Sequence, residues 1–230
     1  MVPRAASNSS ANNMDSLIPH DRYVELLAVL QAPGEAMVTP LGIRREGGRL
    51  VARLYPGTRL QPLGYSVYEA CLAQPYDPLS YYSAVLEHSV ELEPARAVHA
   101  PCPRAEGPRV EAIVSSRERA PGGFIVLWLD PIHVEEGGGW ALYSRSLGCS
   151  IELLIALTRL RFWARARSLT PEPPCRTVRR LAYTVLESFD CILHSTWSPE
   201  LHRAAARAAR EALDNAYMAG CLAPSEVEAF

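Results

Sequence analysis

The chain has 230 residues, 48% of them hydrophobic, and a formal net charge of −2. This composition predicts a packed globular protein of one large or two small domains, and it excludes a wholly disordered chain. The small net charge argues against a nucleic-acid partner. No run of about 18 apolar residues is present that would predict a membrane span.

The first residues, MVPRAASNSSANNMDS, are small and polar. They lack the apolar centre of a secretory signal, so we expect a disordered tail over residues 1–20 and a cytoplasmic protein.

Residues 21–142 are predicted to be mainly β. Short apolar stretches rich in Val and Ile alternate here with Gly/Pro turns, a pattern typical of a closed barrel. The expected strands are Tyr23–Gln31, Glu35–Arg45, Arg49–Tyr55, Tyr65–Gln74, Arg109–Glu118 and Phe124–Glu135. A short helical turn, Leu79–Leu86, interrupts them, with Asp77 as its N-cap and Pro78 at its first position.

Residues 143–230 change to a helical period. Apolar residues recur at helical spacing over Ser144–Ala166 and Thr177–Leu193. A third helix has Ser198 as its N-cap and Pro199 at its first position, and it ends near Gly220. The expected fold class is therefore α+β with a mainly β core, followed by a C-terminal segment of about three helices.

The stretch Thr39–Arg59 predicts a β-hairpin whose turn contains Gly47 and Gly48. In such a hairpin the start of one arm lies beside the end of the other. Pro40-Leu41-Gly42 and Gly57-Thr58-Arg59 are thereby brought together, and their amides, hydroxyl and guanidinium form a candidate phosphate cradle. Each residue also has a plainer interpretation, since Pro56 and Gly57 suit any turn and arginines such as Arg59 usually lie in solvent.

All 23 basic residues are arginine. Without lysine, the chain cannot form a Schiff base with a carbonyl or with pyridoxal phosphate. Codon bias is the simplest cause of this composition. An anionic ligand would have to be held by arginine, backbone amides or hydroxyls.

The six cysteines, at 71, 102, 149, 175, 191 and 221, form no Cys-x-x-Cys pair, which argues against a structural zinc site. The default expectation is buried free thiols. Disulfides become the expectation for a hyperthermophile, in which intracellular bridges occur.

Several segments resemble, in order, an archaeal and methylotroph family of unknown function with the FMN-binding split-barrel fold, related to flavin reductases. Gly34–Gly42 resembles its Gly-x-Pro-Asn-Ala-Ala-Pro-Met-Gly hairpin, and Tyr55–Arg59 is similar to its Phe-x-Gly-Ser-Arg/Lys segment. Asp77-Pro78 resembles an Asp-Asp-Pro motif. Ser144-Arg145 and Ile151–Arg159 resemble its Asn-Arg and Ile-Glu-Ala-Leu-Ile-His-Ala-Thr-Arg helix.

The resemblance covers roughly residues 22–200 and departs from the family pattern at two places. The stretch Ala36–Thr39 lacks the asparagine and is more apolar, and Thr58 replaces a serine while keeping the hydroxyl. The phosphate end of the site is therefore better supported than the end that would hold the isoalloxazine ring.

The resemblance implies an FMN-binding flavoprotein, a flavin-dependent oxidoreductase with NAD(P)H or a deazaflavin as electron donor. It further implies a homodimer with the flavin at or near the interface. The implied cofactor-binding residues are Thr39, Leu41, Gly42, Tyr55, Gly57, Thr58, Arg59 and Arg145. Arg145 also stands out by itself, because a cation near the start of a helix opposes the helix dipole.

Two alternatives remain. The first is a split-barrel protein without flavin that acts as a binding or regulatory module, which the apolar Ala36–Val38 favours. The second is an enzyme similar to pyridoxamine-phosphate oxidase, which would still use FMN. No metal site is expected.

Overall fold

The structure, a computed structural model, describes residue 18 and residues 24–56, 58–137, 145–166 and 174–223. The chain divides into two compact units. The first, the barrel unit, comprises Met1–Tyr76 and His88–Ala141, and the second, the helical unit, comprises Asp77–Glu87 and Leu142–Phe230.

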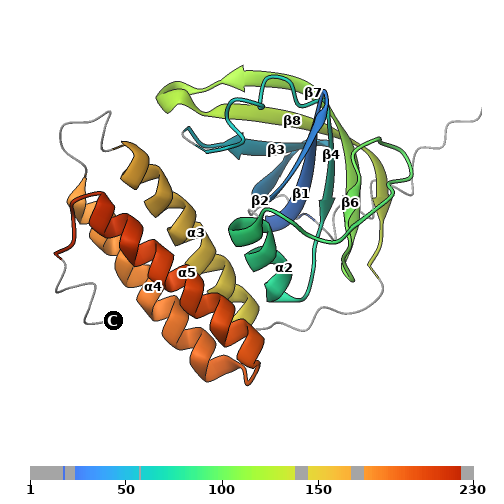
Figure 1. Ribbon diagram of the computed structural model, residues 1–230. Coiled ribbons are helices and arrows are strands. Elements are labelled where there is room, and N and C mark those ends of the chain that lie inside the picture. Colours follow the sequence, from blue (N-terminus) through green and yellow to red (C-terminus); the bar gives the residue numbers. More distant parts are fainter. Residues whose placement is uncertain (1–17, 19–23, 57, 138–144, 167–173, 224–230) are drawn as a thin grey trace, which may run out of the picture. The chain divides into compact units, whose positions relative to one another are not determined.

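Six antiparallel strands close into a barrel in the order β1-β2-β3-β8-β7-β4 (Figure 1). Their bounds are β1 Val24–Ala32, β2 Glu35–Glu46, β3 Arg49–Leu54, β4 Glu69–Ala73, β7 Arg109–Arg119 and β8 Ile125–Glu135. The predicted barrel is confirmed.

Strand alternation fills the barrel. Every second residue of β1, for example Leu26, Ala28 and Leu30, joins one buried apolar cluster. The other strands contribute in the same way, with Leu41, Ile43, Leu50, Ala52, Leu54, Ala70, Leu72, Val110, Ala112, Val114, Ile125, Leu127 and Leu129. The residues between these point away from the barrel interior.

Both predicted hairpins form. β2 and β3 pair from Ile43↔Ala52 to Glu46↔Arg49, and Gly47 adopts a φ of 61° in the turn between them. β7 pairs with β8, joined through a 3₁₀ turn, η2 (Pro121–Gly123), in which Gly122 and Gly123 have a φ of 82°. Positive φ values of this size favour glycine, which explains both turn sequences.

The strand predicted over Tyr65–Gln74 is wrong in its first part, because β4 begins only at Glu69. Between Thr58 and Val67 the chain instead makes successive turns, with amides bonding to carbonyls three residues earlier. These turns place Leu60, Leu63 and Val67 against the barrel core. The segment packs there rather than extending the sheet.

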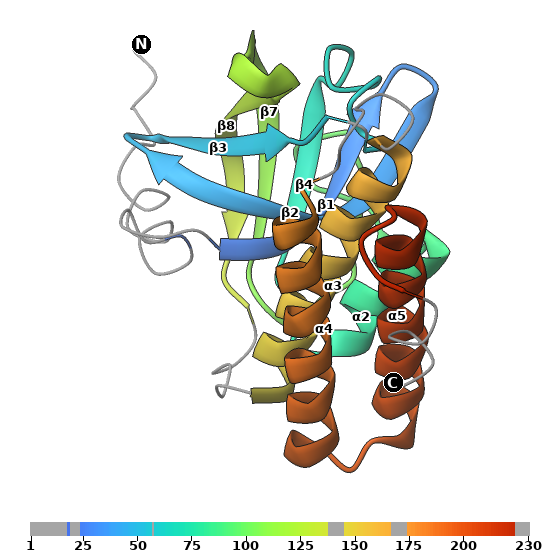
Figure 2. The same ribbon diagram turned by 90° about the vertical axis from the view of Figure 1, so that its left-hand side faces the viewer.

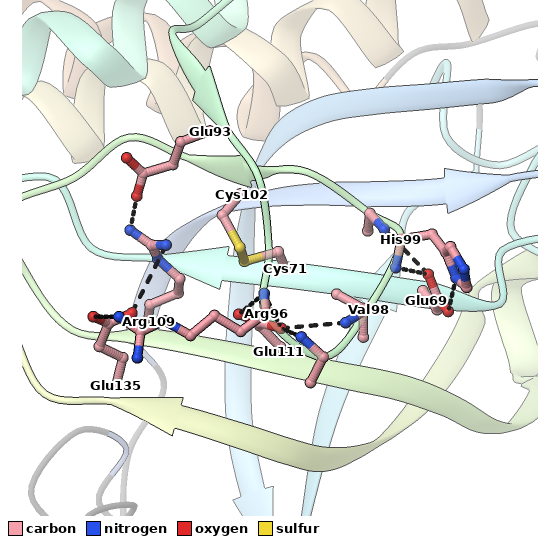
Figure 3. Close-up of a disulfide and its surroundings, with 12 residues drawn as sticks. Glu69, Cys71, Glu93, Arg96, Val98, His99, Cys102, Arg109, Glu111 and Glu135 are labelled. Atoms are coloured by element: carbon pink, nitrogen blue, oxygen red, sulfur yellow. Dashed lines mark hydrogen bonds and ion pairs between the residues drawn. A yellow bond between two sulfur atoms is a disulfide. The ribbon is translucent and has the colours of Figure 1, made fainter.

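A segment absent from the predicted elements, the strap (residues 91–104), crosses the outer side of β4 and β7. It contains the two-stranded sheet of β5 (Leu92–Glu93) and β6 (Cys102–Pro103). Cys102 forms a disulfide with Cys71 of β4 (Figure 3). Beside it, the fully buried Glu111 carboxylate accepts hydrogen bonds from the amides of Arg96, Ala97 and Val98 at 2.6–3.3 Å.

A second carboxylate, that of Glu69 on β4, holds the next residues of the strap. It accepts hydrogen bonds from the amides of His99 and Ala100 at 2.7 and 3.1 Å and contacts the His99 ring at 3.1 Å. Burial raises the pKa of Glu69, but these hydrogen bonds and the His99 ring outweigh it and lower the pKa overall. The contact therefore stabilises the fold above the ordinary pKa of glutamate and is lost as the pH falls through the lowered value.

The helical unit contains α2 (Pro78–Tyr82), the π-helical turn η1 (Ser83–Glu87), α3 (Arg145–Ala166), α4 (Cys175–Ser195) and α5 (Pro199–Met218) (Figure 2). The capping predictions are confirmed, because Asp77 accepts from the Leu79 amide at 3.0 Å and Ser198 from the Leu201 amide at 3.2 Å. α3, α4 and α5 pack on one another, and α2 packs on α3 and α5. None of the described helices is long and apolar enough to cross a membrane.

Buried tyrosines of α2 and a hydrogen bond to η1 join these short elements to the longer helices. Tyr81 and Tyr82 are each 2% exposed, and burial raises the pKa of Tyr82 to about 12 although Ser150 of α3 lowers it slightly. Arg161 of α3 donates to the Val85 carbonyl at 3.1 Å and forms an ion pair with Glu211 of α5 at 2.5 Å.

The expectation of free thiols is wrong. All six cysteines form disulfides, which are Cys71–Cys102 in the barrel unit and Cys149–Cys191 and Cys175–Cys221 in the helical unit. Each bridge joins residues distant in the chain, which is why spacing alone could not reveal the pairs.

Substitution of Gly64 tests how tightly the turns between Thr58 and Val67 pack on the barrel. A Cβ at this position would lie 2.8 Å from Ile125 Cδ1 and 2.9 Å from Leu54 Cδ1. We therefore expect Gly64→Ala to lower the free energy of unfolding by about 1–3 kcal/mol, the cost of overpacking. Gly48→Ala is the control, since no atom lies within 4 Å of its added Cβ. Chemical denaturation measures both, and equal stabilities would contradict the packing described.

Candidate functional site

The predicted site residues of β2 lie along one strand. Thr39 pairs with Ala28 of β1, Leu41 with Leu26 and Gly42 with Glu25. Leu41 is 4% exposed and belongs to the barrel core, so only its backbone can face a ligand. The Thr39 hydroxyl donates to the Pro40 carbonyl at 3.1 Å and keeps its acceptor lone pairs.

Gly42 lies beneath a carboxylate that the sequence did not indicate. A Cβ built on Gly42 would lie 2.9 Å from Glu25 Oε1. The missing side chain thus lets the Glu25 side chain approach the backbone of β2. Glu25 could have been suspected only from the register of β1 against β2.

The second group of predicted residues follows β3. Thr58 donates from its hydroxyl to the Tyr55 carbonyl at 2.7 Å and from its amide to the same oxygen at 3.4 Å. Gly57 lies outside the described residues. The successive turns described above follow Thr58, so no helix begins in the described residues from Thr58 to Leu63.

Arg59 is exposed in the same turn. Its guanidinium has no hydrogen bond or ion pair to any residue in the described part of the chain, so it is available to an anion. The Tyr55 ring, 48% exposed, meets the Phe124 ring edge to face at a centroid distance of 5.1 Å. Arg59 thus follows Tyr55, one ring of this partly exposed aromatic pair, by four residues in the chain.

The turn between β7 and β8 also contributes to this region, which the sequence did not predict. Besides Phe124, the Gly123 carbonyl accepts a hydrogen bond from Gln61 Nε2 at 3.1 Å. Gln61 follows Arg59 in the turn segment, so this bond anchors the candidate phosphate turn to the neighbouring hairpin. The paired glycines before Phe124 were the available signal, but they indicated only a turn.

The hairpin brings the two groups to one end of its ladder. The last paired residues are Ile43 and Ala52. Ile43 directly follows Gly42 on one arm, and Ala52 stands two and three residues before Leu54 and Tyr55 on the other. Leu41 and Leu54 belong to the same core cluster. The Thr58 hydroxyl and the Arg59 guanidinium, which no described residue binds, follow this end of the ladder in the chain. Such groups bind phosphates, and their joining with Gly42 in one site stays a prediction.

Arg145 is the first residue of α3 and is exposed. It belongs to the helical unit, whereas the other predicted residues belong to the barrel unit. Its approach to them stays a prediction.

Comparison with solved structures identifies the fold. An FMN-bound protein from Methanosarcina mazei, assigned to the family DUF447, matches with a TM-score of 0.66 at 16% identity, over 86% of this chain and 99% of that chain. The barrel has the FMN-binding split-barrel fold. No protein-family model matches the sequence, and no curated protein is significantly similar to it.

Weaker similarities concern proteins with flavin-related descriptions. A flavin reductase complexed with NADP⁺ matches with a TM-score of 0.46 at 7% identity, over 56% of this chain and 89% of that chain. An FMN-binding protein from Thermus thermophilus with bound p-hydroxybenzaldehyde matches with a TM-score of 0.43 at 10% identity, over 60% of this chain and 83% of that chain. These two similarities are too low to bear on the function of this chain.

Proposed function

We propose that this protein is an FMN-binding flavoprotein that acts as a flavin-dependent oxidoreductase. The observation that carries the proposal is the split barrel, which matches an FMN-bound protein over almost the whole of that protein's length. The free guanidinium of Arg59 at the end of the β2–β3 hairpin supports it independently.

The residues at the phosphate end fit FMN. A dianionic phosphate needs hydrogen-bond donors and positive charge, and Arg59 provides a guanidinium that no described residue already uses. Thr58 holds the turn in shape through its bond to Tyr55, and its hydroxyl lies next to Arg59 in the chain. The Tyr55–Phe124 pair offers an apolar edge beside these polar groups.

The ring end would lie along Thr39, Leu41 and Gly42. Backbone groups of β2 can bind the polar edge of an isoalloxazine ring, and the Thr39 hydroxyl is half-buried nearby. The Glu25 carboxylate covers Gly42, but it is the far end of a flexible side chain and can rotate away from the strand. A ligand at Gly42 therefore displaces a side chain rather than the backbone.

Bound FMN would supply hydride transfer at its N5 atom. The chain's own residues would bind the phosphate through Arg59 and Thr58 and orient the ring along β2. NAD(P)H or a deazaflavin is the proposed electron donor. A homodimer with the flavin at or near the interface, in the cytoplasm, completes the proposal, and Arg145 is assigned to the same site.

The alternative is a split barrel that binds no flavin and serves as a binding or regulatory module. The apolar Ala36–Val38 stretch and the carboxylate over Gly42 favour it. The visible absorbance of the purified protein decides between the two. A flavin spectrum that bleaches on anaerobic addition of NADH or NADPH supports the oxidoreductase, and a colourless protein that ignores added FMN supports the alternative. An enzyme similar to pyridoxamine-phosphate oxidase would also be yellow, and oxidation of pyridoxamine phosphate would distinguish it.

Arg59 should contribute most to phosphate binding. We expect Arg59→Ala to weaken FMN binding by roughly 1.5–3 kcal/mol, the value of a hydrogen bond to a charged group. Riboflavin, which lacks the phosphate, should bind wild type and variant equally weakly. Arg210→Ala, which removes an exposed arginine of α5, is the matched control. Isothermal titration measures these affinities, and unchanged FMN affinity in Arg59→Ala would remove Arg59 from the site.

Arg145 should face the flavin phosphate or an interface carboxylate. Its reversal, Arg145→Glu, is then expected to lower FMN affinity by more than about 1 kcal/mol, because an attraction becomes a repulsion. A merely solvated Arg145 would give the opposite pattern, with intact affinity and a slightly higher melting temperature, since an acidic residue suits the start of a helix. Melting temperatures with and without FMN separate these results, with Arg210→Glu as control.

A further inference from the structure

The outer face of α4 carries an ordered set of charges. Arg176, Arg179 and Arg180 are exposed in its first half, and Glu187 and Asp190 are exposed in its second half. The opposite face, with Val178, Ala182, Val185 and Ile192, is buried. α4 is the orange helix labelled in Figure 2.

This order does not stabilise an isolated helix. Cations near the N-terminal end and anions toward the C-terminal end oppose the helix dipole, and α4 has no acidic residue in its first turn. Arg176 and Arg180 are also like charges one helical turn apart, a spacing that is repulsive. The pattern therefore suggests a partner outside the helix.

Few of these charges are used within the described part of the chain. Arg179 donates to the Cys221 carbonyl at 2.9 Å, and Asp190 contacts His194 at 3.4 Å. The side chains of Arg176, Arg180 and Glu187 form no ion pair with any described residue. An open hollow of about 730 Å³ runs along α4 from Cys175 to Glu187.

The charges are symmetric about Tyr183, which is 63% exposed. Arg176 and Asp190 are equally far from Tyr183 along the helix, and so are Arg179 and Glu187. Two copies of α4 that run antiparallel across a two-fold axis at Tyr183 would therefore place Arg176 opposite Asp190 and Arg179 opposite Glu187, and would place Arg180 one residue away from Glu187. A two-fold contact uses the same surface on both subunits, and such a surface must be complementary to itself.

We propose that the outer face of α4 binds α4 of a second copy of this chain, antiparallel and centred on Tyr183. In this contact Arg179 lies opposite the partner's Glu187 with Arg180 one residue further along, and the hollow gives room for the partner's side chains. Leu193 and Trp197, which are 40% and 97% exposed, lie at and just beyond the C-terminal end of α4. In the antiparallel contact this end lies beyond the first residue of the partner's α4. The inference rests on the homodimer of the proposed function and adds to the flavin interface a second contact surface, in the helical unit.

Charge reversal tests the contact. Sedimentation at micromolar concentration should give wild type about twice the 25.3 kDa chain mass. Arg180→Glu and Glu187→Arg should each raise the dimer dissociation constant by at least about tenfold, because each places two like-charge pairs in one interface. Arg210→Glu on α5 is the control and should sediment as wild type.

Mixing the two variants provides the decisive measurement. A heterodimer of Arg180→Glu with Glu187→Arg has opposite charges between positions 180 and 187 at both contacts, so an equimolar mixture should have a lower dissociation constant than either variant alone. Recovery to the wild-type value is not expected, because Arg179 then faces one arginine at position 187. Such rescue also requires both variants to be folded. Single variants that sediment as wild type, a mixture that stays monomeric, or a monomeric wild type would each overturn the inference.

FMN binding, followed by flavin absorbance in the same runs, keeps the two proposals apart. If mixing the two variants restores the dimer and the protein binds no FMN, the α4 contact is supported and the flavoprotein is refuted. An FMN-binding dimer that neither charge reversal affects would refute the α4 contact and leave the flavoprotein intact.

Discussion

Closure of the six-stranded barrel is the constraint on which the barrel unit depends. Once β1 pairs with both β2 and β4, each strand must present alternate residues to one enclosed core. The residues between them are then committed to the outer side. This alternation puts Leu41 in the core while its neighbour Gly42 lies under Glu25, so a ligand in the proposed site would contact the backbone of β2 rather than the Leu41 side chain.

The same alternation creates the anchor for the strap. Glu69 and Cys71 lie two apart on β4, and Glu111 pairs with Cys71 across the β4–β7 ladder. All three point outward, where two carboxylates and a disulfide bind the strap. Glu111 is fully buried, and its side-chain oxygens are satisfied there because three backbone amides donate to them in place of water. Burying a carboxylate in this way satisfies amides of a segment with little regular structure of its own.

Local signals predicted the parts of this structure that local forces shape. The glycines of the β2–β3 turn, the caps Asp77 and Ser198 and the helical period after residue 143 each act within a few residues, and the structure confirms all of them. The strap could not be predicted, because the contacts that hold it join residues 13–31 positions apart. For the same reason Phe124 and Glu25 could not be predicted, because they reach the candidate site only through strand pairing.

The division of the chain restricts how this protein can be cut. Because Asp77–Glu87 belongs to the helical unit while the strands on both sides of it belong to the barrel, the polypeptide passes between the two units three times. A fragment starting at residue 142 would lack Tyr81 and Tyr82, and α3 and α5 would be left with an uncovered apolar surface where those rings pack. A fragment ending at residue 76 would lack β7 and β8, so that β3 and β4 would become open sheet edges. Neither unit is therefore a transferable module, and recombination between related genes would preserve both only by exchanging them together.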